Sequence, residues 1–408
     1  MVRADADPAW VDIVAGVPAW TADGRIAWTA DSAGTRRLVV ATPEQHAAGA
    51  AEPVTPPGLQ VRQVLDTDGD AVLFSASGED PAAIGLWLWR PAGLTPLTMS
   101  NGLGSGRRSG GTTLITSQGL DSTGTTVTVR RDSDPDSPGI PIASLAQAPS
   151  LPDPRPRLSY GGPRRIRTAI VLPSWHRPGS ARLPVLCDPY GGPHGQRVFA
   201  ARGAFWTPQW LADQGFAVVI ADGRGTPGRG PAWDRTVAGD LATPALEDQV
   251  EALRAAADEC PDLDLSRVGI RGWSFGGYLA ALAVLRRPDV FHAAVAGAPV
   301  TDWRLYDTHY TERYLGLPQE HPEVYEQSSV LAGAAKLSRP LMIIHGLADD
   351  NVVVAHSLRL SGALLAAGRP HTVLPLTGVT HMASREEVAE NLLLLQVEFL
   401  RSALEGRG

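Results

Sequence analysis

The spacing of apolar residues changes near residue 150 and divides the chain into two regions. Before it, short runs of alternating apolar and polar residues are separated by turn signals, as in PAWTADGRIAW, where Asp23-Gly24 joins two such runs. An Asp-Gly pair between alternating runs is typical of a β-hairpin. A second pair, Asp68-Gly69, precedes AVLFSAS, IGLWLWRP follows as its expected partner strand, and TTLITSQ and TTVTVRR continue the series. We predict an all-β region.

The amount of sequence in this β region limits its architecture. A β-propeller blade has four strands in about 40–50 residues, and several blades are needed to close the ring. The region holds about three blades by the same spacing, so it resembles a partial β-propeller. We therefore expect a chain truncated at its N-terminus. The alternative is a small open sheet against the second region.

Residues 132–165 contain many Pro, Ser, Asp and Arg residues and few long apolar runs, which is typical of an inter-domain connection. The predicted domains are 1–150, all-β with this linker, and 151–408.

From Ile166 onward, strand-like and helix-like patterns alternate. The strand candidates are short, continuous apolar runs of the kind found in buried parallel strands: RTAIVLP, PVLCDPY, FAVVIADGRG, RVGIRGW, AAVAGAP, LMIIHG and HTVLPL. The helical patterns between or after them are ALEDQVEALRAAADE, GGYLAALAVLRRP, AHSLRLSGALLAAG and EEVAENLLLLQVEFLRSAL. This alternation predicts a doubly wound, mostly parallel α/β sheet.

Composition and charge narrow the choice of partners. The net charge is −7 with 43% hydrophobic residues, so the sequence has neither the basic footprint of a nucleic-acid binder nor a cationic stripe for a membrane surface. No stretch reaches the ~20 apolar residues of a membrane span. Two cysteines cannot build a disulfide framework, and Cys187, in an apolar run, is expected to be a buried thiol. The N-terminus lacks the apolar core of a signal peptide. A cytoplasmic location follows if Met1 is the true start.

The strongest chemical signal is the pentapeptide Gly272-Trp273-Ser274-Phe275-Gly276, which fits G-x-S-x-G between a predicted strand and a predicted helix. In that context the serine lies on a sharp, strained turn at the carboxyl edge of the sheet, and small flanking glycines let the turn close. We predict that Ser274 is a nucleophile and that the second domain has the α/β-hydrolase fold.

A serine hydroxyl needs a base, and the base needs a third group to orient it. In this fold the partners follow in the order serine, acid, histidine, on loops after later strands. His381 lies on the loop after HTVLPL and is the predicted base. The loop after LMIIHG contains Asp349 and Asp350, which spacing alone does not separate. His345 ends a strand and is expected to make structural hydrogen bonds.

The negative oxygen of the reaction intermediate needs fixed hydrogen-bond donors. One predicted donor is the backbone N–H of Phe275, the residue after the nucleophile. The second comes from the glycine-rich loop 188–195, in which Tyr190 offers a phenol. On the residues alone, Tyr190 is equally well explained as a packing aromatic.

Together these motifs resemble the prolyl oligopeptidase family, in particular its dipeptidyl peptidase IV branch. The resemblance covers roughly residues 160–404 and rests on GWSFGGY, APVTDWRLYDTHYTERYLGLP and HGLADDN. It implies that Asp349 is the acid and that the Tyr190 hydroxyl completes the oxyanion hole. It also implies a hydrophobic pocket for a proline ring, formed by Phe275, Val300, Trp303, Tyr306, Tyr310 and Val352. Asn351 would hold the carbonyl of the preceding substrate residue.

The resemblance implies a serine peptidase that cleaves after proline, or less well alanine, through an acyl-enzyme, without a metal or organic cofactor. It also suggests a homodimer built partly through the hydrolase domain. Phe275 stands where the best-known members carry tyrosine, which preserves an aromatic wall. No Glu-Glu pair precedes residue 150 to anchor a substrate amino terminus, and Glu386-Glu387 lies in the C-terminal helix. Release of dipeptides is therefore expected only of a longer parent.

Two other functions fit the same pattern. An acylaminoacyl peptidase or a small-molecule esterase uses the same fold, since fold does not fix substrate. A β-rich interaction module with an inactive hydrolase is the non-enzymatic alternative, and the complete set of triad residue types argues against it.

Overall fold

The computed structural model describes residues 2–135, 137–147 and 150–405. Contacts between residues divide the chain into two compact units. The first unit comprises Met1–Asp153 together with two later segments, Phe199–Trp206 and Pro227–Arg235. The second comprises Pro154–Val198, Thr207–Thr226 and Thr236–Gly408. The β-rich region thus falls in one unit and most of the α/β region in the other.

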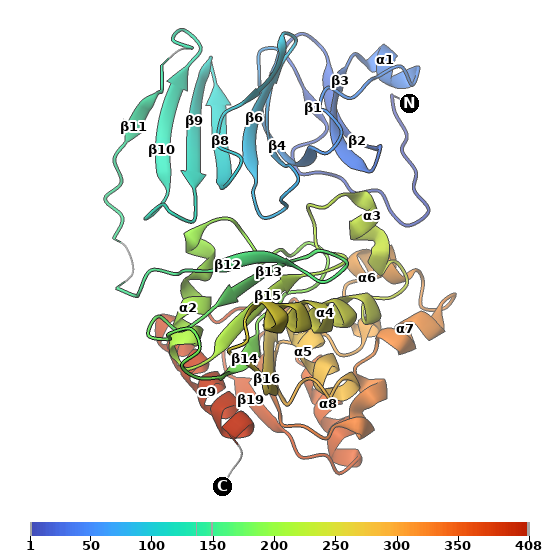
Figure 1. The fold of residues 1–408 in the computed structure, drawn as a ribbon. Coiled ribbons are helices and arrows are strands. Elements are labelled where there is room, and N and C mark those ends of the chain that lie inside the picture. The colour runs from blue at the N-terminus through green and yellow to red at the C-terminus, as the bar shows by residue number, and fades with distance from the viewer. Residues whose placement is uncertain (1, 136, 148–149, 406–408) are drawn as a thin grey trace. The chain divides into compact units, whose positions relative to one another are not determined.

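The first unit contains three antiparallel sheets in its described residues (Figure 1). The first sheet is formed by β1 (Ala19–Trp20), β2 (Ile26–Ser32) and β3 (Thr35–Ala41). The second is formed by β4 (Gln60–Asp68), β5 (Ala71–Ser77), β6 (Gly85–Arg90) and β7 (Gly93–Pro96). The third is formed by β8 (Leu103–Ser109), β9 (Thr112–Gln118), β10 (Thr126–Arg131) and β11 (Ile140–Ile142). The described part of the unit also contains two short helices, α1 (Pro43–Ala47) and α3 (Pro231–Asp234), and the 3₁₀ turn Arg202–Phe205. The predicted propeller-like β region is confirmed.

The Asp-Gly turns join strands as the sequence predicts. Strands β1 and β2 pair across Asp23-Gly24, with Trp20 opposite Ile26, and β4 and β5 pair across the turn at Gly69. Gly24 and Gly69 have φ of 81° and 63°, a region that glycine enters without steric cost. The predicted partnership of AVLFSAS and IGLWLWR is the β5–β6 pair.

Two apolar layers hold the three sheets together. One layer joins the first and second sheets through side chains such as Leu38, Val40, Val64 and Phe74. A smaller layer joins the second and third sheets: Ala71, Leu73, Leu86, Leu88 and Ile115. The smaller layer is supplemented by Arg108, whose buried guanidinium bridges Asp68 and Asp132. Each sheet therefore buries its apolar face against its neighbour, as stacked blades do.

The second unit is built on an eight-stranded sheet in the order β12-β13-β15-β14-β16-β17-β18-β19. Its strands are β12 (Arg157–Gly161), β13 (Ile166–Val171), β14 (Leu183–Cys187), β15 (Ala217–Asp222), β16 (Leu263–Trp273), β17 (Ala293–Gly297), β18 (Leu341–Gly346) and β19 (Thr372–Leu376). The β12–β13 and β13–β15 pairs are antiparallel, and the remaining pairs are parallel. The doubly wound, mostly parallel α/β sheet is confirmed. Cys187 is buried at the end of β14, where burial raises the pKa of its thiol to about 12.

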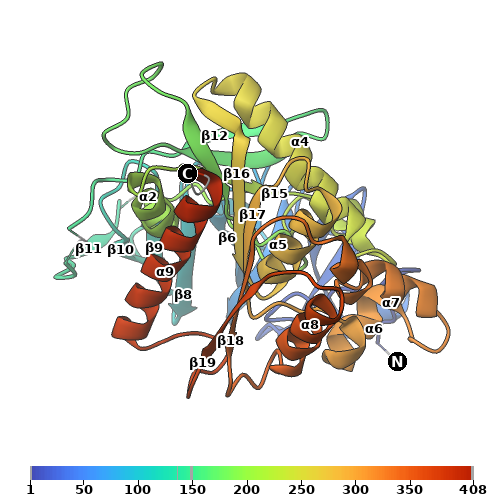
Figure 2. The ribbon, with the colours of Figure 1, turned by 90° about the horizontal axis from the view of Figure 1, so that it is seen from below.

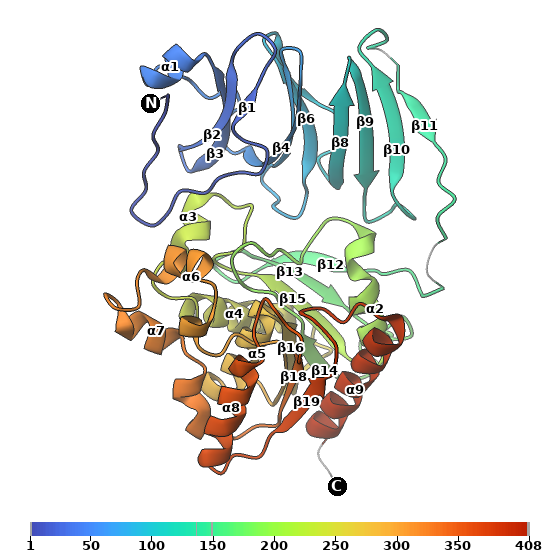
Figure 3. The ribbon, with the colours of Figure 1, turned by 180° about the vertical axis from the view of Figure 1, so that it is seen from behind.

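Helices cover both faces of this sheet (Figures 2 and 3). One face carries α4 (Thr243–Glu259), α5 (Phe275–Arg286) and α8 (Ala355–Ala366). The other carries α2 (Trp206–Asp213) and α9 (Glu386–Glu405). Two further helices, α6 (Thr308–Leu315) and α7 (Pro322–Ser328), lie in the connections, as do the 3₁₀ turns Arg235–Val237, Trp303–Leu305 and Leu331–Lys336. No helix within the described ranges has both the length and the hydropathy required to cross a membrane.

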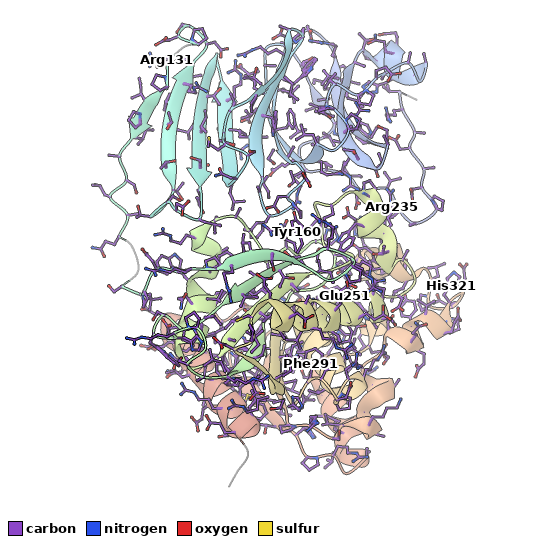
Figure 4. The ribbon with its side chains drawn as sticks, viewed as in Figure 1. Arg131, Tyr160, Arg235, Glu251, Phe291 and His321 are labelled. Atoms are coloured by element: carbon purple, nitrogen blue, oxygen red, sulfur yellow. The ribbon has the colours of Figure 1, made fainter. Side chains whose placement is uncertain are left out.

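The predicted connection over residues 132–165 needs a correction, because it contains β11 and β12. Strand β12 is the edge strand of the large sheet and is only half buried, so it lacks the continuous apolar run of a central strand. Figure 4 labels Tyr160 on β12 and Glu251 on α4. The Tyr160 ring centroid lies 4.6 Å from the guanidinium carbons of Arg165 and Arg167. Strand β12 is therefore held by cation–π contacts as well as by its pairing with β13.

A buried histidine makes the stability of this unit depend on pH. His356, near the start of α8, is 0% exposed, and its Nδ1 accepts the backbone N–H of Thr301 at 3.1 Å. Burial, aided by nearby His345, lowers the pKa of His356 to about 4. The unfolded chain therefore binds a proton between about pH 6.5 and 4 that the folded chain does not. Stability from this group is complete above pH 6.5 and falls by up to about 3 kcal/mol as the pH approaches 4.

We expect His356→Asn to flatten this pH dependence. The asparagine Oδ1 lies near the position of Nδ1 and accepts the Thr301 N–H, but it does not titrate. Urea unfolding midpoints at pH 7, 5.5 and 4.5 measure the effect. The matched control is His321→Asn, at the half-exposed histidine labelled in Figure 4, which should keep the wild-type slope. An unchanged slope in His356→Asn would contradict the assignment.

Candidate active site

Ser274 lies at the turn between β16 and α5, with φ 59° and ψ −119°. A non-glycine residue rarely adopts positive φ, and such strain persists only where neighbouring contacts enforce it. The Ser274 N–H donates to the carbonyl of Gly297 at 2.9 Å, and its own carbonyl accepts the N–H of Tyr278 at 2.9 Å. These two bonds fix the turn between the neighbouring strand and the first turn of the helix. This is the geometry expected of a nucleophile elbow.

Glycines allow the backbone segments around Ser274 to approach one another. A Cβ on Gly272 would lie 2.2 Å from the carbonyl oxygen of Gly276, and one on Gly277 would lie 2.2 Å from that of Gly297. A Cβ on Gly276 would lie 2.6 Å from the carbonyl oxygen of Pro189, on the loop that carries Tyr190. Helix α5 therefore contacts β17 and the 188–195 loop directly through the backbone.

Asp349 and His381 are brought together as the sequence predicts. Nδ1 of His381 lies 2.8 Å from Oδ2 of Asp349, whose side chain is fully buried. The other oxygen, Oδ1, accepts the backbone N–H groups of Asn351 and Val352 at 3.0 and 2.9 Å. Asp350 is exposed. Of the two candidate acids, Asp349 is thus the one hydrogen-bonded to His381.

Backbone hydrogen bonds hold the acid loop against the histidine loop. The Leu347 N–H donates to the carbonyl of Leu376 at 2.9 Å, and the Ala348 N–H donates to that of Val379 at 3.0 Å. These bonds continue the pairing of β18 with β19 beyond the ends of both strands. They place Asp349 and His381 on neighbouring loops at the carboxyl edge of the sheet.

Ser274 and His381 lie on adjacent segments. The indole Nε1 of Trp273, next to Ser274, donates to the carbonyl of His381 at 2.7 Å. In the described part of the chain no hydrogen bond joins the Ser274 hydroxyl to His381. Catalytic hydrogen bonds commonly tighten only when substrate binds. Direct Ser274–His381 contact remains a prediction.

His345 is engaged in structural hydrogen bonds, as expected. Its Nδ1 lies 2.6 Å from the Ser357 hydroxyl, and its Nε2 lies 2.7 Å from the carbonyl of Val352. Burial lowers the pKa of His345, which favours the neutral ring. His345 supports the loop that carries Asp349.

The proposed oxyanion donors lie on the two sides of the elbow. The N–H of Phe275 belongs to the first turn of α5, where backbone N–H groups have no partner within the helix. The rings of Tyr190 and Phe275 are 5.8 Å apart. Burial, with a smaller effect of Tyr306, raises the pKa of Tyr190 to about 12. The phenol therefore stays protonated at neutral pH and remains a hydrogen-bond donor.

An ion-pair cluster anchors the start of the Tyr190 loop. Buried Asp188 pairs with Arg197 at 2.6 Å and lies 3.7 Å from Arg271, which is on β16 three residues before the nucleophile. Burial acts to raise the pKa of Asp188, but the two guanidinium groups lower it overall. The carboxylate is thus charged, and it links the strand of Ser274 to the loop of Tyr190.

The four aromatic members of the predicted substrate-binding set, Phe275, Trp303, Tyr306 and Tyr310, form one cluster. The Trp303 ring stacks on Tyr310 with centroids 6.0 Å apart and contacts Tyr306 and Phe275 edge-on or tilted, each at 5.8 Å. The Tyr306 hydroxyl donates to Oδ1 of Asn351 at 3.1 Å. Val300, Trp303, Val352 and Phe275 are buried, whereas Tyr306 and Tyr310 are half-buried and Asn351 is exposed. The two tyrosines therefore present the accessible surface of the cluster, and buried Trp303 lies against both.

Several residues of the site were not predicted from the sequence. Tyr278 and Tyr314 extend the aromatic cluster, with ring centroids 5.2 Å from Trp303 and 5.0 Å from Tyr310 respectively. His194 contacts both Tyr310 and Tyr314. The spacing of Tyr310 and Tyr314 at i and i+4 on one helix is a signal that reveals their shared face. No comparable signal exists for His194 or for the Trp273 indole.

The chain is similar in sequence and in structure to known peptidases. The family model described as "Prolyl oligopeptidase family" matches residues 202–407. Mouse dipeptidyl peptidase 8 is 37% identical over 236 residues, which are 57% of this chain and 26% of that protein. Cat dipeptidyl peptidase 4 is 36% identical over 202 residues, 49% of this chain and 26% of that protein. The crystal structure of Porphyromonas gingivalis dipeptidyl peptidase 4 has a TM-score of 0.83 at 27% identity.

That structural match covers 94% of this chain and 55% of the Porphyromonas gingivalis chain, so it includes the β-rich unit as well as the hydrolase unit. The aligned part of each curated relative is about a quarter of its length. The family match spans half of this chain and contains Ser274, Asp349 and His381. The chain belongs to the prolyl oligopeptidase family.

Proposed function

We propose that this chain carries the catalytic domain of a serine peptidase that cleaves after proline, or less well alanine, and that acts as a dipeptidyl peptidase in its full-length form. The observation that carries the proposal is the His381–Asp349 hydrogen bond on loops adjacent to a serine held at positive φ. Membership of the prolyl oligopeptidase family supports it.

The proposed reaction proceeds through an acyl-enzyme. The Ser274 Oγ attacks the carbonyl carbon of the scissile bond while Nε2 of His381 takes its proton. Asp349 holds Nδ1–H of the ring, which leaves Nε2 as the acceptor and stabilises the imidazolium. The Tyr190 hydroxyl and the Phe275 N–H stabilise the tetrahedral oxyanion.

Collapse of the intermediate breaks the C–N bond, and the leaving amine takes the proton from His381. Water then repeats the sequence on the ester, with His381 again as base, and releases the acid product and free Ser274.

The aromatic cluster accounts for the proposed preference for proline. A pyrrolidine ring is rigid and loses little conformational freedom on binding, and flat aromatic faces contact it over a large area. Tyr306 and Tyr310 supply such faces, supported by Trp303. Alanine fills the same site with less contact, so it is the weaker substrate. The Asn351 side chain, hydrogen-bonded to Tyr306, is proposed to hold the carbonyl of the preceding residue.

A comparison of free and N-blocked substrates tests this function. We expect hydrolysis of Gly-Pro-p-nitroanilide to exceed that of Gly-Ala-p-nitroanilide in kcat/KM, because of the pocket. In the full-length form, faster cleavage of the free dipeptide substrate than of its N-acetyl form supports dipeptide release. Preference for the N-acetyl form supports an acylaminoacyl peptidase, and hydrolysis of p-nitrophenyl esters alone supports an esterase. Failure to label with a fluorophosphonate would overturn the enzymatic assignment.

The surroundings of the enzyme are also proposed. Exposed apolar side chains occur on α8, β19 and α9, and β19 is an edge strand: Leu358, Leu365, Val373, Leu394 and Leu395. An exposed edge with apolar neighbours favours pairing with a second copy, so we propose a homodimer through this part of the hydrolase domain. Two buried free cysteines are compatible with a cytoplasmic location, which we also propose. The domain division at 150/151 is proposed on the change in sequence pattern.

A further inference from the structure

The loop that carries Tyr190 ends in a tight turn whose backbone lies against the Tyr190 ring. The Gly195 N–H donates to the carbonyl of Gly192 at 3.4 Å. A Cβ on Gly195 would lie 2.0 Å from Cδ1 and 2.3 Å from Cε1 of Tyr190. The phenol therefore rests directly on the glycine backbone, and the position of this turn sets the position of the ring.

The residue before Gly195 faces the aromatic cluster. The Tyr314 hydroxyl is hydrogen-bonded to Nε2 of His194. The His194 ring lies 5.7 Å from Tyr310 and 6.0 Å from Tyr314, centroid to centroid. Tyr310 in turn stacks on Trp303. One turn thus contacts the proposed oxyanion tyrosine through Gly195 and the proposed proline pocket through His194.

The backbone of His194 is strained in a way that suits this role. Its φ is 68°, in the left-handed region that non-glycine residues enter at a cost. Asparagine and glycine, which are common at such positions, would satisfy the backbone without the side-chain contacts. The imidazole is the part of the residue that reaches Tyr310 and Tyr314, so its contacts are what a substitution would remove.

We propose that His194 is a positioning residue that couples the aromatic pocket to the oxyanion loop, so that filling the pocket with a ring sets the Tyr190 hydroxyl for catalysis. This inference rests on the proposed function and extends it. It makes proline a better substrate through kcat as well as through binding. A residue that only stabilises the fold would lower the active fraction and leave the proline-to-alanine ratio unchanged.

Two substitutions remove the same hydrogen bond from its two ends. His194→Asn tolerates the left-handed backbone but is too short to reach Tyr314, and Tyr314→Phe removes only the hydroxyl. We expect each to lower kcat for Gly-Pro-p-nitroanilide about tenfold, the scale of one lost hydrogen bond. The ratio of kcat for Gly-Pro-p-nitroanilide to kcat for Gly-Ala-p-nitroanilide should also fall in each variant. The double variant should lose no more than either single variant, because the shared bond is already gone.

Gly195→Ala tests the other contact of the turn. The added methyl group displaces the Tyr190 ring, so this variant should approach Tyr190→Phe, for which loss of one oxyanion donor lowers kcat about 10²–10³-fold. The matched control is Gly362→Ala on α8, where a Cβ meets nothing within 4 Å. It should keep wild-type kcat. All rates are divided by the fraction of protein that a fluorophosphonate titrates.

The outcomes separate this inference from the proposed function. Wild-type protein that hydrolyses p-nitrophenyl esters but not Gly-Pro-p-nitroanilide would overturn the post-proline assignment, and with it the coupling to a proline pocket. Wild-type protein that cleaves after proline, together with additive losses in the double variant or an unchanged proline-to-alanine ratio, would overturn the coupling alone. Wild-type kcat in Gly195→Ala would overturn the contact with Tyr190.

Discussion

Ser274→Ala should lower kcat for Gly-Pro-p-nitroanilide on the order of 10⁶-fold, because removal of the nucleophile leaves only binding and the oxyanion donors to assist water. The hydroxyl is the group lost, and the Cβ that occupies the positive-φ turn is retained. The backbone bonds to Gly297 and Tyr278 do not involve the side chain. We therefore expect the variant to fold as the wild type does. Steady-state kinetics measure the loss of kcat, at an enzyme concentration high enough to detect the residual rate.

Two controls accompany this substitution. Fluorophosphonate labelling should disappear in Ser274→Ala. The thermal unfolding midpoint should stay within a few degrees of the wild-type value, as it does for typical surface substitutions. Labelling that persists would mean that a different hydroxyl is the nucleophile. Full activity in a correctly folded variant would remove the serine mechanism altogether.

Asp349→Asn should lower kcat by about 10⁴-fold, the loss associated with the wrong imidazole tautomer in a serine-histidine-aspartate triad. The carboxylate accepts Nδ1–H of His381 through Oδ2. An amide NH₂ placed there donates instead, so the proton moves to Nε2, which can then no longer accept the serine proton. The amide oxygen still accepts the N–H groups of Asn351 and Val352, which keeps the loop in place.

Asp350→Asn is the matched control, because Asp350 is the neighbouring carboxylate and is exposed. It should change kcat less than threefold, the scale of a modest change in an exposed charge interaction. The two variants also differ in pH dependence, since only Asp349→Asn perturbs the base. A larger loss in Asp350→Asn than in Asp349→Asn would reverse the assignment of the acid.

Most strands of the sheet in the second unit could be predicted because they are buried on both faces. Strand β19 was also predicted from its apolar run, but it is an edge strand and is largely exposed. Runs such as LMIIHG and FAVVIADGRG carry that burial directly in their composition, and both are strands, β18 and β15. Strand β12 was not predicted, because it is a half-exposed edge strand and follows a Pro-rich stretch. The short helices α6 and α7 were not predicted either. Neither is long enough to show a helical period above the polar background.

The residues of the candidate site also differ in how far the sequence predicts them. Chain order and loop placement are local properties of the sequence, so they predicted Ser274 and His381 and narrowed the acid to two adjacent aspartates. The resemblance, and not the spacing, assigned Asp349, the aspartate that is hydrogen-bonded to His381. The contact between Trp273 and the His381 carbonyl joins residues 108 positions apart, and that between His194 and Tyr314 joins residues 120 apart. Pairs so distant in the chain are fixed by the fold, and no single-sequence pattern encodes them. Resemblance to a family supplied Tyr190 and the pocket tyrosines, which residue types alone left ambiguous.

The glycines around the nucleophile have a further consequence for how specificity can change. Gly272, Gly276 and Gly277 let main-chain segments around Ser274 approach closely. These main-chain contacts do not involve the side chains of Trp273 and Phe275. A change of the aromatic ring at position 275 therefore leaves these main-chain contacts in place. The ring at position 275 contacts Tyr190 and Trp303, so substrate range can change through this side chain. A Cβ on any of the three glycines would instead meet main-chain atoms.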